Sequence, residues 1–396
     1  MPYLCKVSPF FGIFASELTK NTSMRYFFKY IILLITLVFS AYSWAGVKVG
    51  VVLPLHDKDG DGLRMVEYYR GVLMAVDQLK NEGYDIVVST WNVPQDGSVS
   101  VVTSDKNAAK CDIIFGPLYS SQVKELGDFC KSKKIKLVIP FSINSWEVTR
   151  NEYIFQVYQT PYNQTLLNVK AFNDRFTNAH TVLVDCMDQN VESRKGEFTK
   201  KLRENLDAKK TQYNMTSLAS NDENFQKAFS RSEHNVVVLN SSRMPELSKV
   251  IARLDKLKAK NPNISISLYG YNEWFMYVPY LTKELHRYDA YIPTNYYFND
   301  AADNTIAFEK AYKGWFHTEL QKSLPRFAIT GYDHAEYFIR GIKAYGKKFV
   351  GMKNQSNYAP IQTPLSFERV GEGGYSNKSF QLIHYKTNGA LEAIRY

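Results

Sequence analysis

Short apolar runs alternate with amphipathic stripes through the first third of the chain. Residues 47–55 (VKVGVVLPL) form a nearly continuous β-branched run, which is typical of a strand buried on both faces of a parallel sheet. Residues 64–80 then carry apolar side chains at helical spacing, and Gly83 ends that stripe. The same alternation predicts further strands at 85–91, 112–115 and 136–140, and helices at 99–110 and 120–131. Strands that alternate with helices across short loops indicate a doubly wound parallel sheet.

The alternation starts again after residue 161 and predicts a second sheet of the same kind. Strands are expected at 181–185, 235–239 and 264–269, with helices at 165–176, 192–206 and 245–258. The C-terminal part adds two long helical patterns, 305–320 and 333–345, and then a hairpin-like end built from 365–369, 380–385 and 391–395. The predicted fold class is therefore α/β, with two doubly wound parallel-sheet lobes.

Composition and charge exclude several classes of protein. The chain has 396 residues, of which 45% are hydrophobic and 22% charged, with 21 Gly, 14 Pro and 4 Cys. These values exclude collagen-like, disulfide-framework and disordered chains, and the length favours two domains that each bury a core. The formal net charge is +10, but no run of five or more Lys or Arg occurs, so a nucleic-acid partner is not supported.

The first 45 residues are expected to be an N-terminal extension followed by a signal peptide. A short basic lead at 24–29 precedes the apolar run 30–40, and the sequence around Ala45 offers the small residues that a signal peptidase accepts. We therefore expect an exported protein that is cleaved near Ala45. A retained N-terminal anchor helix is the alternative, and translation starts at either Met1 or Met24.

Three cysteines, Cys111, Cys130 and Cys186, follow that cleavage site. Cys111 precedes a predicted strand and Cys130 ends the next predicted helix, so both lie at one edge of a right-handed strand–helix unit. A disulfide between them is geometrically possible, and two buried thiols are the alternative. No CxxC motif or Cys/His cluster with zinc spacing occurs, and we predict no metal or other cofactor.

Several segments resemble those of a known family when their order and spacing are taken together. They are residues 49–54 (VGVVLP), 67–77 (EYYRGVLMAVD), 114–121 (IFGPLYSS), 137–142 (LVIPFS), 331–336 (GYDHAE) and 366–389. Through them the chain resembles the type I periplasmic binding proteins, and among these the leucine/isoleucine/valine-binding group, over residues 46–396. The resemblance extends to Bacteroides-type envelope members that often carry a LysM module.

The resemblance implies two lobes that are joined by three crossovers and close on a ligand in the cleft between them. On that pattern lobe 1 comprises 46–158 and 297–352, and lobe 2 comprises 159–296 and 353–396. Ligands of open α/β sheets bind beyond the carboxyl ends of the strands, so the segments that follow strands form the candidate site.

The candidate ligand-binding residues of lobe 1 are Tyr119, Ser120, Ser121, Ser142 and Asn144. The first three join a strand to a helix, where hydroxyl groups and free backbone N–H groups favour an anion such as an amino-acid carboxylate. An ordinary helix N-cap is the alternative. Amino-acid-binding members of the resembled family usually carry small residues and a Thr after the next strand. Phe141 and Ile143 depart from that pattern, which argues against a free α-amino acid as the ligand.

The candidate residues of lobe 2 are Tyr271, Glu273 and Trp274, which follow a predicted strand. The resembled group carries an acidic residue in this region for the ammonium group of its ligand, and Glu273 is the available candidate. Tyr271 and Trp274 either stack on an apolar or sugar face of the ligand or plug the hinge.

The acidic loop 57–62 (DKDGDG) matches the first half of a calcium-binding loop. The closing Glu is out of place, because position 68 is Tyr68 and Glu67 comes one residue early. A solvated acidic loop at the mouth of the cleft is therefore the preferred interpretation.

The sequence contains no GxSxG or HExxH motif and no GxGxxG motif after a strand, so no enzymatic activity is predicted. We expect a periplasmic solute-binding protein that captures a small ligand, such as an amino acid or a peptide, for ABC-type uptake or sensing through a membrane permease. The alternative on the same fold is an interaction module that regulates a cell-envelope or peptidoglycan enzyme by contact.

Overall fold

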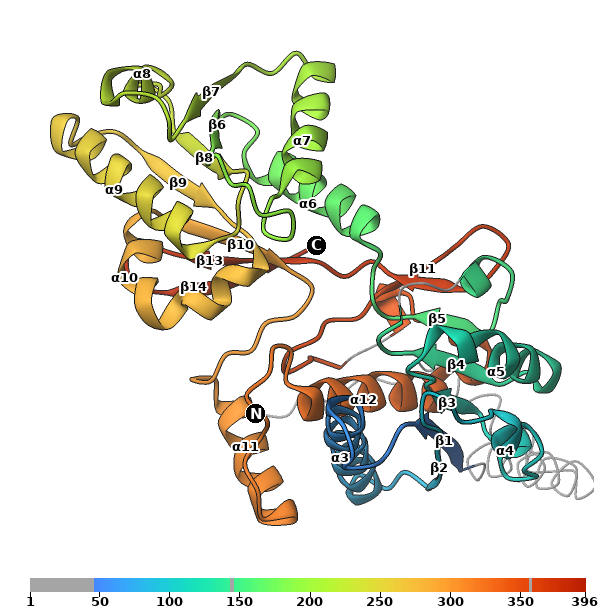
Figure 1. Cartoon of the computed structure of the whole chain (residues 1–396). Helices are drawn as coiled ribbons and strands as arrows, with labels where there is room; N and C mark the ends of the chain where they lie inside the picture. Colours follow the sequence, from blue (N-terminus) through green and yellow to red (C-terminus); the bar gives the residue numbers. More distant parts are fainter. Residues whose placement is uncertain (1–45, 143–145, 356–357) are drawn as a thin grey trace, which may run out of the picture.

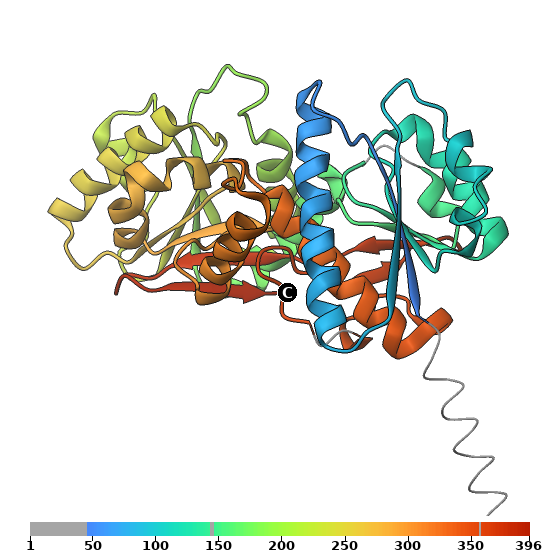
Figure 2. The same cartoon turned by 90° about the horizontal axis from the view of Figure 1, so that it is seen from below.

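The chain folds into two lobes, each built around a sheet of seven strands (Figure 1). The computed structural model describes residues 46–142, 146–355 and 358–396. Figure 2 shows the lobes side by side, with helices on the outside of each sheet. This is the two-lobed α/β architecture that the hydrophobic pattern predicts.

The first lobe is built on parallel strands with apolar side chains on both faces. They are β1 (Val47–Leu53), β2 (Ile86–Asn92), β3 (Ile113–Phe115), β4 (Lys136–Ile139) and β5 (Ile154–Gln156). The helices of this lobe are α3 (Gly60–Asn81), α4 (Ser100–Thr103), α5 (Ser120–Lys133), α11 (Asp303–Phe316) and α12 (Phe327–Tyr345). Val49, Val51 and Phe115 are fully buried, which places the core of the lobe between the sheet and its helices.

Helices α3 and α12 cross in backbone contact, and two glycines make this contact possible. A Cβ atom on Gly71 would lie 1.8 Å from the carbonyl oxygen of Ala328, and one on Gly331 would lie 2.0 Å from that of Tyr68. Any side chain at either position would therefore force the helices apart. Helix α12 is consequently buried over most of its length.

The second lobe repeats the parallel arrangement. Its parallel strands are β6 (His180–Asp185), β7 (Tyr213–Ser217), β8 (Asn235–Leu239), β9 (Ile266–Tyr269) and β10 (Ala290–Thr294). Its helices are α6 (Pro161–Arg175), α7 (Gly196–Ala208), α8 (Asp222–Lys227), α9 (Met244–Lys260), α10 (Val278–Arg287) and the 3-10 helix η3 (Asn272–Tyr277). The buried strand side chains and the inner faces of α7 and α9 form one hydrophobic core.

The C-terminal segment contributes strands to both sheets, as its red ribbon shows in Figures 1 and 2. These strands are β11 (Phe367–Arg369), β12 (Tyr375–Asn377), β13 (Gln381–Tyr385) and β14 (Leu391–Arg395). The strand order is β11-β12-β5-β4-β3-β1-β2 in the first sheet and β14-β13-β10-β9-β8-β6-β7 in the second. The chain therefore passes between the lobes three times, after β5, after β10 and after β12.

This strand order corrects the expected lobe boundary, which assigned residues 353–396 to lobe 2. Strands β11 and β12 belong to the first sheet, where Tyr375 is paired with Phe155 of β5. The ring of Phe155 lies 5.4 Å from that of Phe367 and 4.9 Å from that of Tyr375. Burial of these rings against β5 stabilises the position of the two strands at this edge of the sheet.

The predicted helix 99–110 is also wrong, because the structure has the short helix α4 and a 3-10 turn at Ala108–Lys110 instead. Asp105 lies between them. Its carboxylate accepts hydrogen bonds from the backbone N–H of Asn107 at 2.7 Å and from the indole of Trp91 at 3.0 Å. Such local side-chain bonds compete with helical backbone bonds.

Among the described residues Cys111, Cys130 and Cys186 are buried free thiols, so Cys111 and Cys130 are not bridged. Burial raises the pKa of Cys111 to about 12 and that of Cys186 to about 12, which keeps both thiols protonated. No helix within the described ranges is long and apolar enough to cross a membrane. The expected leader lies outside those ranges.

Candidate functional site

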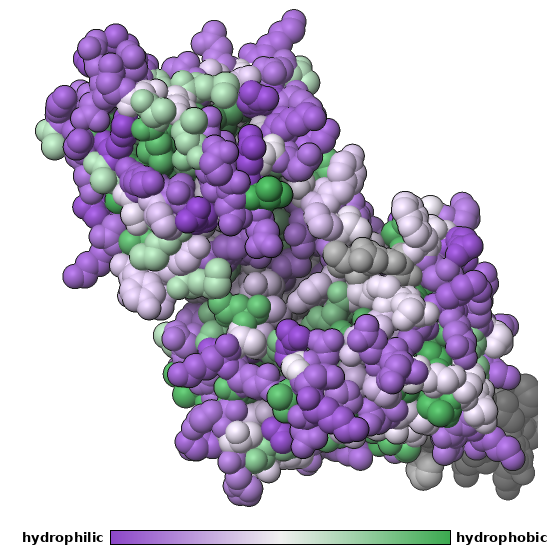
Figure 3. All heavy atoms as spheres, viewed as in Figure 1, coloured by the Kyte–Doolittle hydropathy of each residue, from purple (hydrophilic) through white to green (hydrophobic). Residues whose placement is uncertain are grey.

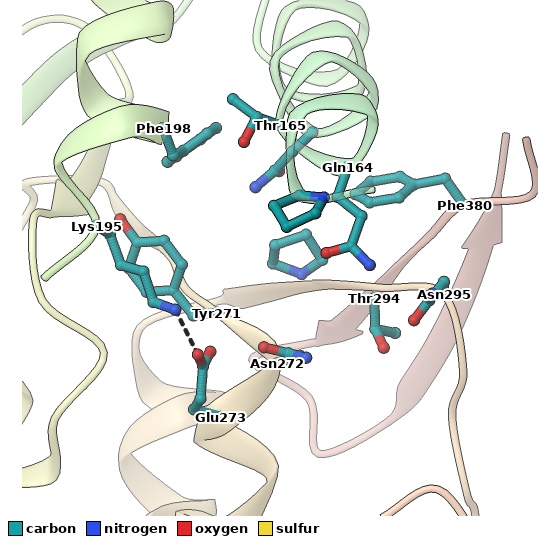
Figure 4. Close-up of a pocket in the computed structure, with 13 residues that line it drawn as sticks. Gln164, Thr165, Lys195, Phe198, Tyr271, Asn272, Glu273, Thr294, Asn295 and Phe380 are labelled. Carbon is teal, nitrogen blue, oxygen red and sulfur yellow. Dashed lines mark hydrogen bonds and ion pairs between the residues drawn. The ribbon is translucent and has the colours of Figure 1, made fainter. Parts of the chain in front are cut away.

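A pocket opens in the second lobe where the three connections between the lobes enter it (Figure 4). One lining residue belongs to each connection: Pro161 begins α6, Asn295 follows β10, and Phe380 precedes β13. The volume is about 200 Å³. The other lining residues are Gln164, Thr165, Asn168, Lys195, Phe198, Tyr271, Asn272, Glu273, Pro293 and Thr294. The pocket thus lies beyond the carboxyl ends of β9 and β10, where open α/β sheets bind their ligands.

An ion pair between Lys195 and Glu273 crosses this pocket (Figure 4). Lys195 is the N-cap residue of α7 and Glu273 lies in the first turn of η3. The two side chains are 23% and 32% exposed, so both remain accessible from the pocket. The ammonium group also lies 5.4 Å from the centre of the Tyr271 ring. The second carboxylate oxygen of Glu273, Oε2, is buried and has no hydrogen-bond donor within the described part of the chain.

Tyr271 and Trp274 differ in what they offer a ligand. The Tyr271 hydroxyl donates a hydrogen bond to the carbonyl oxygen of Leu239, and its ring lines the pocket. Trp274 is fully buried beneath Gly270, where a Cβ atom would lie 2.2 Å from the indole. It presents no face to a ligand in this conformation, so its position fits a structural plug and not a stacking platform.

The candidate serines of the first lobe lie at the carboxyl ends of β3 and β4. Ser120 and Ser121 are the first two residues of α5, whose N-cap position is Tyr119, with no capping bond from its side chain. The N-cap position therefore falls within the candidate segment, at Tyr119, and neither serine occupies it. The hydroxyls of Ser120 and Ser142 lie 2.5 Å apart and form a hydrogen bond with each other. Asn144, the remaining candidate of this lobe, lies outside the described residues.

Tyr119 links this edge to the acidic loop that follows β1. Its hydroxyl donates a hydrogen bond to Asp61 Oδ2 at 3.3 Å, and burial together with the Asp61 carboxylate raises the pKa of Tyr119 to about 12. Asp61 also forms an ion pair with Arg64, while Asp59 caps α3 through the N–H of Gly62. Among the described residues no cluster of three or more His, Cys, Asp or Glu side chains is arranged to hold a metal ion.

The contacts of Phe141 explain why a large residue follows β4, where amino-acid-binding members of the resembled family usually carry small residues. Its ring makes edge-to-face contacts with Tyr68, Tyr158 and Phe327, each at a centroid distance of 5.4 Å. The space that small residues would leave for a carboxylate is filled by this aromatic cluster. Figure 3 shows two masses of atoms that are joined by a narrower middle.

Sequence reasoning identified Tyr271 and Glu273 of the pocket but missed Lys195, Gln164, Thr165 and Asn295. Lys195 is one of 49 basic residues, and nothing in its local sequence indicates a partner 78 positions away. Asn295 follows a strand, as the other candidates do, and recognition of β10 would have identified it.

Comparison with family models gives no match, and neither does comparison with curated proteins. Solved structures do match. A Rhodospirillum rubrum protein assigned to branched-chain amino acid ABC transport aligns with 88% of this chain and 100% of its own, at 12% identity and a TM-score of 0.57. The branched-chain amino acid transporter substrate-binding protein of Streptococcus pneumoniae, solved with isoleucine, aligns with 89% of this chain and 100% of its own, at 15% identity and a TM-score of 0.43.

The match with the Rhodospirillum rubrum protein supports the same two-lobed α/β architecture for both chains. None of the matched structures supports the narrower resemblance to LysM-carrying envelope members. On strand order, lobe connections and this structural match, the chain has the fold of the leucine/isoleucine/valine-binding-protein-like type I periplasmic binding proteins.

Proposed function

We propose that this chain is an exported solute-binding protein that captures a small ligand between its lobes, for uptake through an ABC-type permease or for sensing. The observation that carries the proposal is the pocket at the entry of the three lobe connections. A ligand held there is positioned to contact both lobes when they close. If it binds the closed form more tightly, it shifts the open–closed equilibrium by that difference in affinity.

Two further features favour binding over catalysis. The described residues that line the pocket include no Ser, Cys or His, so they offer no nucleophile paired with an imidazole base. The Rhodospirillum rubrum protein of similar fold is assigned by its title to branched-chain amino acid ABC transport. The expected leader supports a periplasmic location, where such a protein meets its solute.

The proposal is tested by a thermal-shift screen of the purified protein against amino acids, short peptides, muropeptides and simple sugars. A ligand that binds only the native state raises the melting temperature in a concentration-dependent way. The matched variants are Gln164→Trp, which places a large ring in the pocket, and Lys170→Trp on an exposed position of the same helix. We expect the shift to vanish for Gln164→Trp and to persist for Lys170→Trp.

A ligand shift that survives Gln164→Trp would show that the ligand binds elsewhere and would contradict the proposal. A flat response of the unmodified protein to the whole panel would also contradict it, and would favour the alternative interaction module.

A further inference from the structure

We propose that the second-lobe pocket takes an uncharged, hydroxyl-rich ligand, a neutral saccharide unit, and not a free α-amino acid. This inference rests on the proposed function, because it names the ligand class of the same site. It follows from the charges, the unpaired polar groups and the apolar walls of the pocket.

The charges of the pocket already neutralise each other. Lys195 and Glu273 are the only charged side chains among the described lining residues, and they are paired with one another. A ligand ammonium group that approaches Glu273 also approaches the Lys195 ammonium, which repels it. A ligand carboxylate that approaches Lys195 meets Glu273 in the same way.

Glu273 nevertheless needs a hydrogen-bond donor. Its Oε2 atom is buried and unpaired within the described chain, and a buried acceptor without a partner is costly. A hydroxyl group supplies a donor without adding a second positive charge beside Lys195. The site therefore favours a neutral donor.

Other lining groups match hydroxyls in the same way. The side chains of Gln164, Thr165 and Asn295 have no hydrogen-bond partner among the described residues, and all three line the pocket. In Figure 4 the carboxamide of Gln164 extends from α6 into the opening that Thr294 and Asn295 border from the other side. A carboxamide both donates and accepts, as a hydroxyl does, so neighbouring ring hydroxyls pair with it in both directions.

The apolar walls of the pocket and the polar groups of the first lobe also suit a neutral, hydroxyl-rich ligand. Phe198, Tyr271 and Phe380 give the pocket apolar walls, which suit the C–H faces of a sugar ring. A volume of about 200 Å³ limits the buried part of the ligand to a small unit. On the first lobe, the Ser120 and Ser142 hydroxyls offer polar neutral contacts.

The experiment measures binding by calorimetry with the purified protein. The neutral probes are glucose, N-acetylglucosamine and their β-linked disaccharides. The charged probes are glucosamine, glucuronate and glutamate, together with the zwitterions leucine and isoleucine. We expect at least one neutral saccharide to bind about tenfold or more tightly than every charged probe, which corresponds to about 1.4 kcal/mol.

Two variants distinguish recognition of a neutral saccharide from recognition of an ammonium group. Glu273→Gln keeps the shape and an acceptor oxygen but removes the negative charge, so saccharide affinity should change by less than about threefold, whereas recognition of an ammonium group would fall about 100-fold. Asn295→Ala should weaken saccharide binding about tenfold by loss of a donor and an acceptor. Lys170→Ala on the outer surface of α6 is the matched control, with no change expected.

Tighter binding of an amino acid than of any saccharide would overturn this inference and leave the proposed function standing. Absence of saccharide binding at millimolar concentration would overturn it as well. When amino acids, peptides and saccharides all fail to bind, the proposed function falls with it, so the two failures are distinct.

Discussion

The polar side chains at the carboxyl edges of the two sheets differ in whether they are hydrogen-bonded within the protein. On the first lobe the hydroxyls of Ser120 and Ser142 bond to each other, and Tyr119 bonds to Asp61. On the second lobe Gln164 and Asn295 have no partner in the described chain, and Glu273 keeps one oxygen unpaired.

The difference bears on which lobe would contact a ligand first under the proposed function. Polar groups around a pocket that bond only to water exchange that water for a ligand, whereas groups bonded to one another must first break a bond within the protein. Under the proposed function, we expect the ligand to bind the second lobe first and to contact the first lobe afterwards. This order of binding requires the first lobe to be tightly packed and its polar side chains to be paired with one another.

The largest effect is expected at the crossing of α3 and α12, where the two helix backbones of the first lobe are in contact. Gly331→Ala places a Cβ atom 2.0 Å from the carbonyl oxygen of Tyr68, so the helices must separate, and we expect a loss of about 3 kcal/mol or more in the free energy of unfolding. Gly314→Ala on α11 is the control, because nothing lies within 4 Å of its added methyl group. There we expect a gain of up to about 1 kcal/mol. Urea titration of both variants measures the difference, and equal stabilities would show that the crossing is loose.

A smaller effect is expected from His334, which α12 buries in the same lobe. Its Nδ1 atom lies 3.0 Å from the Tyr68 hydroxyl, and burial lowers the pKa of His334 to about 3. The unfolded chain has an ordinary pKa of about 6.5 and takes up the proton first as the pH falls. The contribution of neutral His334 to stability is therefore complete above about pH 6.5 and is lost as the pH falls towards 3.

The measurement compares the unmodified protein with His334→Gln between pH 4.5 and 7. We expect the stability advantage of the unmodified protein to shrink on acidification, by at most about 1.4 kcal/mol per pH unit. Burial raises the pKa of the neighbouring Asp333 to about 6. The contribution of Asp333 to stability has the opposite pH dependence, because it is lost as the pH rises from about 4 to 6. Asp333 is present in both proteins, so their difference isolates His334. A constant difference across this range would contradict the prediction.

Much of the fold was predictable because long buried runs such as β1 and β8 leave a clear hydrophobic pattern. The misses have physical reasons. Strand β5 has only three residues, and β10 contains Pro293, whose missing N–H normally argues against an interior strand. The edge position of β11 and β12 depends on aromatic packing against Phe155, which no local pattern records.

The site was less predictable than the fold, because its contacts join distant parts of the chain. Glu273 could be identified from its place after a strand and from a family resemblance, and it does line the pocket. The ammonium group that pairs with Glu273 belongs to Lys195, which lies at the start of another helix, α7. A carboxylate that seemed available for an ammonium ligand is paired within the protein, which only the tertiary structure reveals.

The smallest effect concerns the hydroxyl pair of the first lobe. Ser142 is 7% exposed, and Ser142→Ala leaves the Ser120 hydroxyl without its partner, so we expect a loss of about 1 kcal/mol in the free energy of unfolding. The exposed hydroxyl of Ser121 has no partner in the described chain, and Ser121→Ala should change stability by less than about 0.5 kcal/mol. Equal, small effects in urea titration would mean that the Ser120–Ser142 bond contributes nothing in the unliganded protein. The first-lobe edge would then be as available to a ligand as the second-lobe pocket, and the order of binding inferred from their difference would fail.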